Sequence, residues 1–191
     1  MEAMQVAERM TAEEYLALPE AASGRPRLSL VEGELVVNEP TPLHSFVDHD
    51  LAFALSVWAR AKPGRGRVLR PIDVLLDESN VFGPDILWYS EGRAPARHGQ
   101  PPSPMPDLAI EIRSPSTWRY DVGAKKAAYE RHGLPELWLV DTAAEAVLVF
   151  RRSIPGARTF DVALELDREA VLESPLLPGF ALAVAELFPA G

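Results

Sequence analysis

Two stretches of the chain carry apolar residues at the spacing of an amphipathic helix. Over residues 43–61 the apolar positions recur every three or four residues, and Pro63 followed by Gly64 ends the run. The positions expected to face the core are Phe46, Val47, Leu51, Leu55 and Trp58. The second stretch, residues 121–132, is shorter and stops at Gly133. We therefore expect a helix in each of the two stretches.

Between and after these helices the pattern changes to the short apolar runs and two-residue alternation of β-strands. Residues 28–38 carry apolar runs on both sides of Glu32-Gly33-Glu34 and fit either two short strands around a Gly turn or one bent ribbon. The other strand candidates are residues 68–76, 85–89, 107–113, 137–140 and 146–151. Pro71 is expected to kink the first of them.

Three further segments complete the predicted elements. Thr11 and Glu14 form a capping box, which predicts a short helix over residues 11–18. Residues 90–105 contain four prolines and two glycines, so we expect a surface loop there, with a flap over an active site as the alternative. Residues 158–191 carry short apolar stretches broken by prolines, which predict closing strands and a short final helix.

The strand over residues 107–113 combines a structural pattern with a chemical one. A period of two places apolar side chains on one face of this strand and charged side chains on the other. The two faces carry, respectively, Leu108, Ile110 and Ile112, and Asp107, Glu111 and Arg113. Charged groups inside a sheet are costly unless they are paired or bind a metal. We therefore expect a functional site on this strand.

The net charge of −9 argues against a general nucleic-acid-binding protein, because phosphate binding normally requires a basic surface. The acidity lies at the two ends. Residues 1–39 hold eight acids and three bases, residues 161–191 hold six and one, and residues 40–160 hold fourteen and fifteen. An acid-free stretch in the middle carries Arg60, Lys62, Arg65, Arg67 and Arg70. It is a candidate for contact with a DNA backbone, with a solvated helix end and loop as the alternative.

At 191 residues and 47% apolar content, the chain can bury one substantial core, and we expect a single domain. It contains no cysteine, so it has neither disulfides nor thiolate metal ligands. No window holds the roughly 18 apolar residues of a membrane span. The first ten residues also lack the pattern of a secretory signal. These features predict a soluble, cytoplasmic protein with no membrane partner.

Several short motifs occur in a specific order. They are Glu-Gly-Glu at 32–34, a His near a helix start at 44, Pro-Asp at 84–85, Pro-Asp-Leu-x2-Glu-x2-Ser-Pro-Ser-Thr at 106–117, Asp-x3-Lys-x3-Tyr at 121–129 and Gly-x-Pro-Glu-x-Trp-x-Val-Asp at 133–141. Each motif alone is weak, but the order and spacing together are specific. With this set the chain resembles the PD-(D/E)XK nuclease superfamily and, within it, the bacterial restriction-endonuclease-like family called Uma-two.

The resemblance implies an α/β fold with a restriction-endonuclease-like αβββαβ core, in which helices flank a mixed sheet. The predicted elements contain a helix, three strands, a helix and a strand in that order. We accordingly divide a single domain, residues 1–191, into three parts. Residues 1–27 are an N-terminal appendage with a helix, residues 28–152 are the nuclease-like core, and residues 153–191 are a C-terminal extension of β additions.

Hydrolysis of a phosphodiester requires an activated water and neutralisation of developing charge, and a hard divalent cation provides both. Magnesium, or manganese in its place, prefers oxygen ligands and is usually held by one or two carboxylates. Asp85 and Glu111 fit this demand, because the core topology would place their strands side by side. The resemblance adds the backbone carbonyl of Ile112. The alternatives are a strand-start role for Asp85 and a structural ion pair for Glu111.

The superfamily usually carries a lysine two positions after the glutamate, and here that position is Arg113. Arginine stays protonated, so Arg113 is expected to steady phosphate charge rather than act as a base. Lys125 is the better candidate for orienting the attacking water, and the Uma-two pattern also carries its lysine on this helix. Asp121, Lys125 and Tyr129 are four residues apart and share one helix face. Tyr129 is expected to hold Lys125 or touch phosphate.

Four other polar residues are candidates for a supporting role around the site. Glu32 is a candidate second-metal ligand. His44 is interpreted as a satisfied histidine at a helix start, with a proton relay or phosphate contact as the alternative. Asp107 shares the face of Glu111, but we favour a role at the start of the strand. Asp121 is expected to cap the following helix rather than bind a metal.

Together these patterns predict a magnesium-dependent endonuclease that hydrolyses DNA phosphodiester bonds. A homodimer is expected, because cutting both strands requires two sites. Two alternatives remain open: a catalytically silent nuclease-fold module for binding or interaction, and a metal-dependent hydrolase of another phosphoester.

Overall fold

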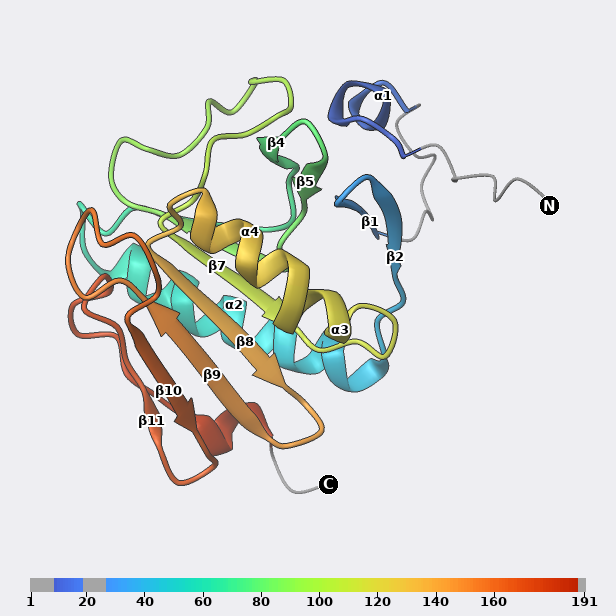
Figure 1. Ribbon diagram of the computed structural model, residues 1–191. Helices are drawn as coiled ribbons and strands as arrows, with labels where there is room; N and C mark the ends of the chain where they lie inside the picture. The colour runs from blue at the N-terminus through green and yellow to red at the C-terminus, as the bar shows by residue number, and fades with distance from the viewer. Residues whose placement is uncertain (1–8, 19–26, 189–191) are drawn as a thin grey trace, which may run out of the picture.

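A six-stranded sheet lies between two helical layers (Figure 1). The computed structural model of the protein describes residues 9–18 and 27–188. The strand order in the main sheet is β10-β9-β8-β7-β6-β3. The bounds are β3 Arg67–Leu69, β6 Ile86–Tyr89, β7 Leu108–Ile112, β8 Glu136–Asp141, β9 Ala146–Arg151 and β10 Val162–Leu166. β7 and β8 run parallel and the other neighbours run antiparallel, so the predicted mixed sheet is confirmed.

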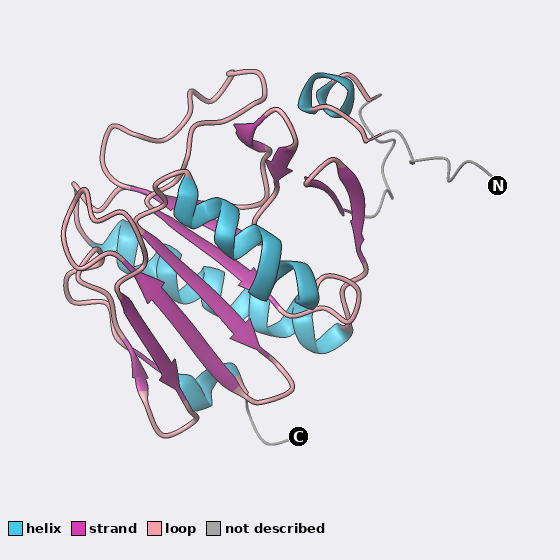
Figure 2. Ribbon diagram, viewed as in Figure 1, coloured by secondary structure: helices cyan, strands magenta, loops and turns pink. Residues whose placement is uncertain are grey.

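The sheet has a different helix on each face (Figure 2). Helix α2 (Pro42–Ala61) packs on one face, where its apolar side chains meet those of β6 and β7. A continuous helical segment packs on the other face and consists of α3 (Trp118–Tyr120), the π-helical turn η1 (Asp121–Lys125) and α4 (Lys126–Arg131). The alternation predicted for β7 is confirmed, since Ile110 lies in the α2 core and Ala109 in the α4 core.

A second sheet, of order β2-β1-β5-β4, stands beside the first. Its strands are β1 Arg27–Val31, β2 Glu34–Asn38, β4 Val74–Asp77 and β5 Asn80–Phe82. The two-strand interpretation of residues 28–38 is therefore confirmed. Helix α1 (Ala12–Leu16) has the predicted capping box and packs on this sheet through Ala12 and Tyr15.

Two predictions about local structure are wrong. Residues 68–76 are not one strand but belong to β3 and β4, which lie in different sheets. Pro71 lies between them and has no N–H to donate to a ladder, so the pairing ends there. Phe46 was expected in the core, but 70% of its side-chain surface is exposed on α2.

The C-terminal part closes the core on the side of α2. It contains β11 (Val171–Leu172), β12 (Leu182–Ala183) and the 3₁₀ helix η2 (Val184–Leu187). Buried apolar residues from this part, such as Phe180 and Leu187, join the α2 core. Closing strands and a short final helix were predicted and are confirmed. None of the described helices is long and apolar enough to cross a membrane.

Candidate active site

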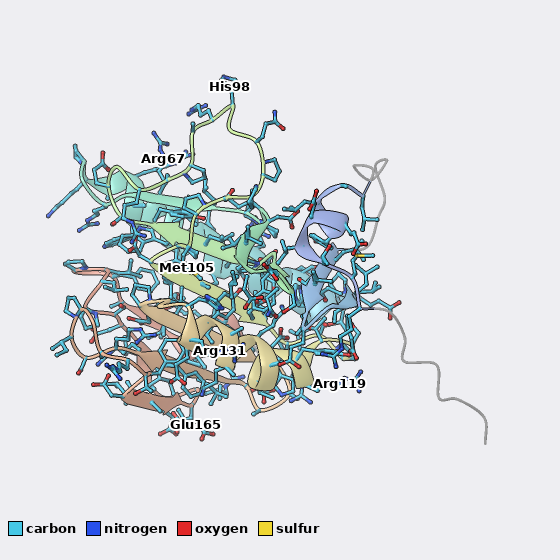
Figure 3. All side chains as sticks on the ribbon, turned by 45° about the horizontal axis from the view of Figure 1, so that its top comes forward. Arg67, His98, Met105, Arg119, Arg131 and Glu165 are labelled. Atoms are coloured by element: carbon cyan, nitrogen blue, oxygen red, sulfur yellow. The ribbon has the colours of Figure 1, made fainter. Side chains whose placement is uncertain are left out.

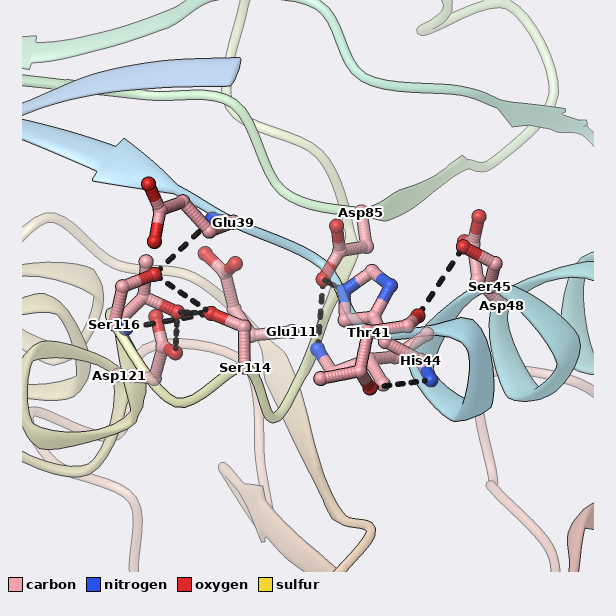
Figure 4. A network of polar contacts seen from close by, with 12 residues as sticks. Glu39, Thr41, His44, Ser45, Asp48, Asp85, Glu111, Ser114, Ser116 and Asp121 are labelled. Atoms are coloured by element: carbon pink, nitrogen blue, oxygen red, sulfur yellow. Dashed lines mark hydrogen bonds and ion pairs between the residues drawn. The ribbon is translucent and has the colours of Figure 1, made fainter. Parts of the chain in front are cut away.

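The register between β6 and β7 brings Asp85 opposite Glu111. Ile86 pairs with Ile110 in the antiparallel ladder, and one step further along places Asp85 across from Glu111. Side chains opposite each other on neighbouring strands lie on the same face of a sheet. The Oδ2 atom of Asp85 accepts a hydrogen bond of 2.8 Å from the backbone N–H of Ile112. The two carboxylates are therefore close enough for their charges to interact (Figure 4).

The helical segment over this face adds an ammonium and a phenol to Glu111. Lys125 Nζ lies 3.0 Å from Glu111 Oε1 and 2.9 Å from Asp121 Oδ1. Tyr129 donates its hydroxyl to the same Glu111 oxygen at 2.9 Å. The predicted spacing of four thus does bring Asp121, Lys125 and Tyr129 to one face. Tyr129 contacts Glu111, however, rather than the lysine.

Asp121 is held in place inside the protein and does not cap a helix. The helical segment begins three residues earlier than predicted, at Trp118, and the Asp121 side chain makes no cap. Its Oδ2 atom accepts a hydrogen bond of 2.9 Å from Thr117, whose hydroxyl lies 2.8 Å from that of Ser114. The Ser-Pro-Ser-Thr motif therefore builds a hydroxyl chain that orients the partner of Lys125. The capping prediction was wrong because the helix start was misplaced.

The segment from Asp121 to Lys125 is a π-helix rather than an α-helix. Such single π-helical turns are rare and occur frequently at functional sites, because they shift side chains relative to a regular helix. Here the turn contains both members of the Asp121–Lys125 ion pair.

His44, from helix α2, contacts the Asp85 carboxylate. The N-terminus of α2 is capped by Thr41, whose hydroxyl accepts from the backbone N–H of His44. The His44 ring is buried, and its Nε2 atom lies 3.3 Å from Asp85 Oδ2. His44 is therefore not only a residue at a helix start, as interpreted from the sequence, but also a neighbour of the candidate carboxylate.

Burial dominates the electrostatics of this cluster. Glu111 and Lys125 are only 3% and 4% exposed. Burial raises the pKa of Glu111 to about 7; the Lys125 charge opposes this rise, while Asp121 and Asp85 add to it. Burial alone would lower the pKa of Lys125, but the carboxylates of Asp121 and Glu111 outweigh it and raise that pKa. Lys125 is therefore protonated at neutral pH and acts as a hydrogen-bond donor, not as a base.

Three predicted site residues lie outside this cluster, namely Arg113, Glu32 and Asp107. Arg113 pairs with Asp141 at 2.8 Å and stacks its guanidinium on Trp118. Glu32 is exposed in the β1–β2 turn with φ of 51°. The turn directs the Glu32 side chain to solvent, and the alternation of apolar and polar residues in the sequence does not reveal this turn.

Asp107 lies on the same face of the strand as Glu111 in the two-residue alternation. It is four residues away, however, which is about 13 Å at roughly 3.3 Å per residue. Its carboxylate binds the backbone N–H of Ser90 at 2.8 Å and pairs with Arg93. It therefore anchors the loop of residues 90–105, as a residue at the start of a strand. This loop leaves the end of β6 opposite to Asp85, so it does not form a flap over the cluster.

The chain matches a known protein family over most of its length. The model of the Uma2 family, described as "Putative restriction endonuclease", matches residues 12–185 of the chain. The chain belongs to the Uma2 family. The match covers all residues of the cluster described above.

A solved structure shows the same fold for this Uma2 protein. The present chain is similar to the crystal structure of a putative nuclease belonging to DUF820 from Anabaena variabilis, with 22% sequence identity and a TM-score of 0.76. The similarity covers 94% of this chain and 97% of the other. The restriction-endonuclease-like α/β fold is thereby confirmed. No functionally curated protein shows significant similarity to the chain.

The five basic residues expected to contact DNA divide into two groups in this Uma2 protein. Arg65 donates to the Trp58 carbonyl and stacks on its ring, and Arg70 pairs with Asp48, so both serve the fold. The other three, Arg60, Lys62 and Arg67, have exposed side chains.

Glu136, at the start of β8, is a buried carboxylate outside the cluster. Its two oxygens accept hydrogen bonds from the Trp138 indole at 2.6 Å and the Ser174 hydroxyl at 2.8 Å. Burial raises the pKa of Glu136 above its usual 4.5, because these bonds only partly offset the loss of water. Its ionised form therefore costs stability in the folded state.

Glu136→Gln is expected to stabilise this Uma2 protein at pH 7 by about 1 kcal/mol, the usual size of a single favourable substitution. The amide keeps an acceptor for Trp138 and a donor for Ser174 but carries no charge. Because the folded-state pKa is raised, the wild-type penalty is absent below about 4.5, grows as the pH rises from there to the folded-state pKa, and is constant above it. The free energies of unfolding of both proteins, measured with urea at pH 7 and pH 4, give the gain at each pH. An equal gain at both pH values would contradict the assignment.

Proposed function

We propose that this protein is a metal-dependent endonuclease that hydrolyses DNA phosphodiester bonds. The observation that carries the proposal is the convergence on Glu111 of a carboxylate from the neighbouring strand and an ammonium from the following helix. Membership of the Uma2 family and the nuclease fold support the reaction class. Action on DNA implies a cytoplasmic location.

The donor set fits magnesium or manganese. Asp85 and Glu111 would hold the ion with their carboxylates, and the Ile112 carbonyl would add an oxygen. Within a strand the N–H and C=O of one residue point to the same side, and the Ile112 N–H faces Asp85. Among the described residues, no three His, Asp or Glu side chains form a ready metal cluster. Two carboxylates with water suffice for magnesium, which when bound activates water and neutralises phosphate charge.

The side chains around this donor set have distinct tasks in the proposed reaction. Lys125, held protonated by Asp121 and Glu111, donates a hydrogen bond that orients the attacking water. Tyr129 fixes the Glu111 carboxylate, and His44 orients Asp85 from the opposite side. Arg113 keeps its Asp141 partner and acts on phosphate charge only if the substrate displaces that partner.

The test is cleavage of supercoiled plasmid by purified protein with magnesium. Wild-type protein is expected to nick or linearise the plasmid, and Asp85→Ala and Glu111→Ala are each expected to abolish the activity. Activity that survives both substitutions would overturn the proposal.

A second candidate function is a catalytically silent binding module of the same fold. The near-complete burial of Glu111 and Lys125 favours it, because a buried ion pair also serves a purely structural role. Calorimetric titration with manganese discriminates between the two functions. Binding that is lost in Glu111→Ala supports the enzyme, and no binding together with DNA association supports the module. Cleavage of a panel of other phosphoesters, but not of DNA, would instead support a different metal-dependent hydrolase.

We also propose that the protein forms a homodimer through α2. Four large apolar side chains stand exposed in a stripe on this helix: Leu43, Phe46, Phe53 and Val57, at 44, 70, 64 and 53% exposure. Exposed stripes of this kind mark interaction surfaces. A second α2 packed antiparallel about a two-fold axis near residues 49 and 50 would place Phe46 opposite the second copy's Phe53. The same axis places His49 opposite Asp50, so the stripe is self-complementary in apolar and polar positions.

Asp50→Cys is expected to form a covalent dimer on treatment with a short bis-maleimide, because residue 50 lies near the proposed axis. The chain has no cysteine of its own, so the reaction is specific. Ile154→Cys, at a residue that is 64% exposed in the loop after β9, is the matched control and is expected to remain monomeric in denaturing gels. Equal cross-linking of both variants, or a monomer at about 100 μM in sedimentation, would argue against this dimer.

A further inference from the structure

A cleft with a volume of about 740 Å³ lies at the end of the main sheet opposite to the candidate active site. The end of α2, the edge strand β3 and the loop of residues 90–105 form its walls. In Figure 3 this loop rises from the ribbon, with Arg67 near one side and His98 at its tip. The volume is within the range of sites that bind small ligands or segments of larger ones.

Three arginines line this cleft, namely Arg60, Arg67 and Arg97. None of the three has an ion pair or a side-chain hydrogen bond within residues 9–18 and 27–188, whereas Arg65, Arg70 and Arg93 are engaged. Among the described residues that line the cleft, Glu91 is the one acid. In a chain of net charge −9, a wall with three free guanidiniums and one carboxylate is a local reversal of sign.

The loop over the cleft is fixed at both ends. At its start, Asp107 binds the Ser90 N–H and pairs with Arg93. At its end, the Tyr89 hydroxyl donates to the Pro104 carbonyl at 2.8 Å, and the Ser103 N–H donates to the Asp73 carbonyl at 2.7 Å. The span between these anchors carries Arg97. The cleft is therefore built into the fold.

The lining of the cleft has an apolar part, here called the floor, and a polar part. Val68, Leu69 and Ile72 line the floor from β3 and the following turn. The polar part consists of hydroxyls and an amide from Ser56, Ser90, Gln100 and Ser103. Guanidiniums match phosphate oxygens in charge and geometry, and an apolar floor suits the face of a base or sugar.

We propose that this cleft binds the phosphates of a nucleic acid strand, with Arg60, Arg67 and Arg97 on the phosphates and the floor under a base. This inference rests on the proposed function for the choice of nucleic acid, but it concerns a separate site. The four residues of β6 lie between Asp85 and Ser90 of the cleft, which are about 16 Å apart at roughly 3.3 Å per residue. The cleft therefore holds the strand away from the reacting phosphate.

The experiment measures binding without cleavage. A fluorescein-labelled single-stranded 12-mer is titrated with the full chain in EDTA, and anisotropy is followed at several salt concentrations. The triple variant Arg60→Gln, Arg67→Gln, Arg97→Gln is expected to bind about tenfold more weakly or worse. Its salt slope is expected to fall by about 2, since each lost phosphate contact removes about 0.7. Arg131→Gln, an exposed arginine on α4 without a partner among the described residues, is the matched control and is expected to bind like wild type.

A second arm uses thymidine monophosphate as competitor, which separates a free nucleotide from a strand as the source of the phosphate. Competition that the triple variant loses assigns the cleft to single nucleotides, and its absence assigns it to strands; both support a phosphate site. Unchanged affinity and salt slope in the triple variant would overturn the inference. Because binding is measured in EDTA, a protein that binds but does not cut contradicts the endonuclease proposal alone.

Discussion

Glu111→Gln is expected to reduce DNA cleavage by about a thousandfold, or roughly 4 kcal/mol of transition-state stabilisation, while leaving the fold intact. Glutamine has the shape of glutamate and keeps an oxygen for the Tyr129 hydroxyl and for Lys125. Lys125 also retains Asp121 as a partner, so no charge is left alone in the interior. What disappears is the negative charge that a divalent ion requires. Single-turnover cleavage of a labelled duplex measures the change.

Glu136→Gln provides the matched control for this loss. Glu136 is equally buried and lies on the neighbouring strand, but it contacts Trp138 and Ser174 instead of the cluster. The DNA cleavage activity of Glu136→Gln is expected to equal that of wild type. Manganese titration gives a second readout, with binding retained in Glu136→Gln and lost in Glu111→Gln. Full cleavage by Glu111→Gln would remove Glu111 from the chemistry.

Lys125→Met is expected to destabilise the protein by about 3–5 kcal/mol, the usual result of removing one partner from a buried ion pair. Glu111 and Asp121 would then face each other in the interior without their shared cation. Methionine fills a similar volume, so the loss reflects charge rather than a cavity. Urea unfolding at pH 7 measures it. Lys126→Met is the control, because Lys126 only lies over the Phe150 ring, and it is expected to change stability by less than about 1 kcal/mol.

A second substitution tests the cause of that destabilisation. Adding Asp121→Asn to Lys125→Met removes one of the two uncompensated charges and is expected to recover part of the lost stability. A double variant less stable than Lys125→Met alone would show that packing around Lys125, not electrostatics, accounts for the effect.

The sequence predicted the parts of the site that depend on strand and helix periodicity. Asp85 and Glu111 meet because their strands are neighbours and the register is set by apolar residues on both faces. Lys125 and Tyr129 contact Glu111, and Asp121 contacts Lys125, because a spacing of four keeps side chains on one helix face.

The sequence reveals neither the partners of Arg113 nor the role of Asp121. Arg113 follows the alternation of β7, but Asp141 at the end of β8 and the Trp118 ring hold its guanidinium. Periodicity contains no information about such partners. Asp121 was misassigned because a π-helical turn and an earlier helix start have no simple sequence signature.

The exposure of Phe46 has a different origin. Helical spacing shows which residues share a face, but α2 is apolar on two sides, and only the sheet determines which side is covered. The cleft was missed because Arg97 lies in a loop without periodicity, some thirty residues from Arg67 in the chain.

Asp107 directly precedes strand β7 and Glu111 lies near the other end of the strand, so β7 sets the distance between them. Asp107 ties down the roof of the arginine-lined cleft, and Glu111 lies at the centre of the candidate chemistry. Their separation of about 13 Å is set by a rigid, buried strand. A nucleic acid bound in this cleft, as proposed above, would meet the carboxylates a constant number of nucleotides away, about four steps of roughly 3.4 Å in a duplex. Product ends would then be measured from the gripped position and not from the base sequence.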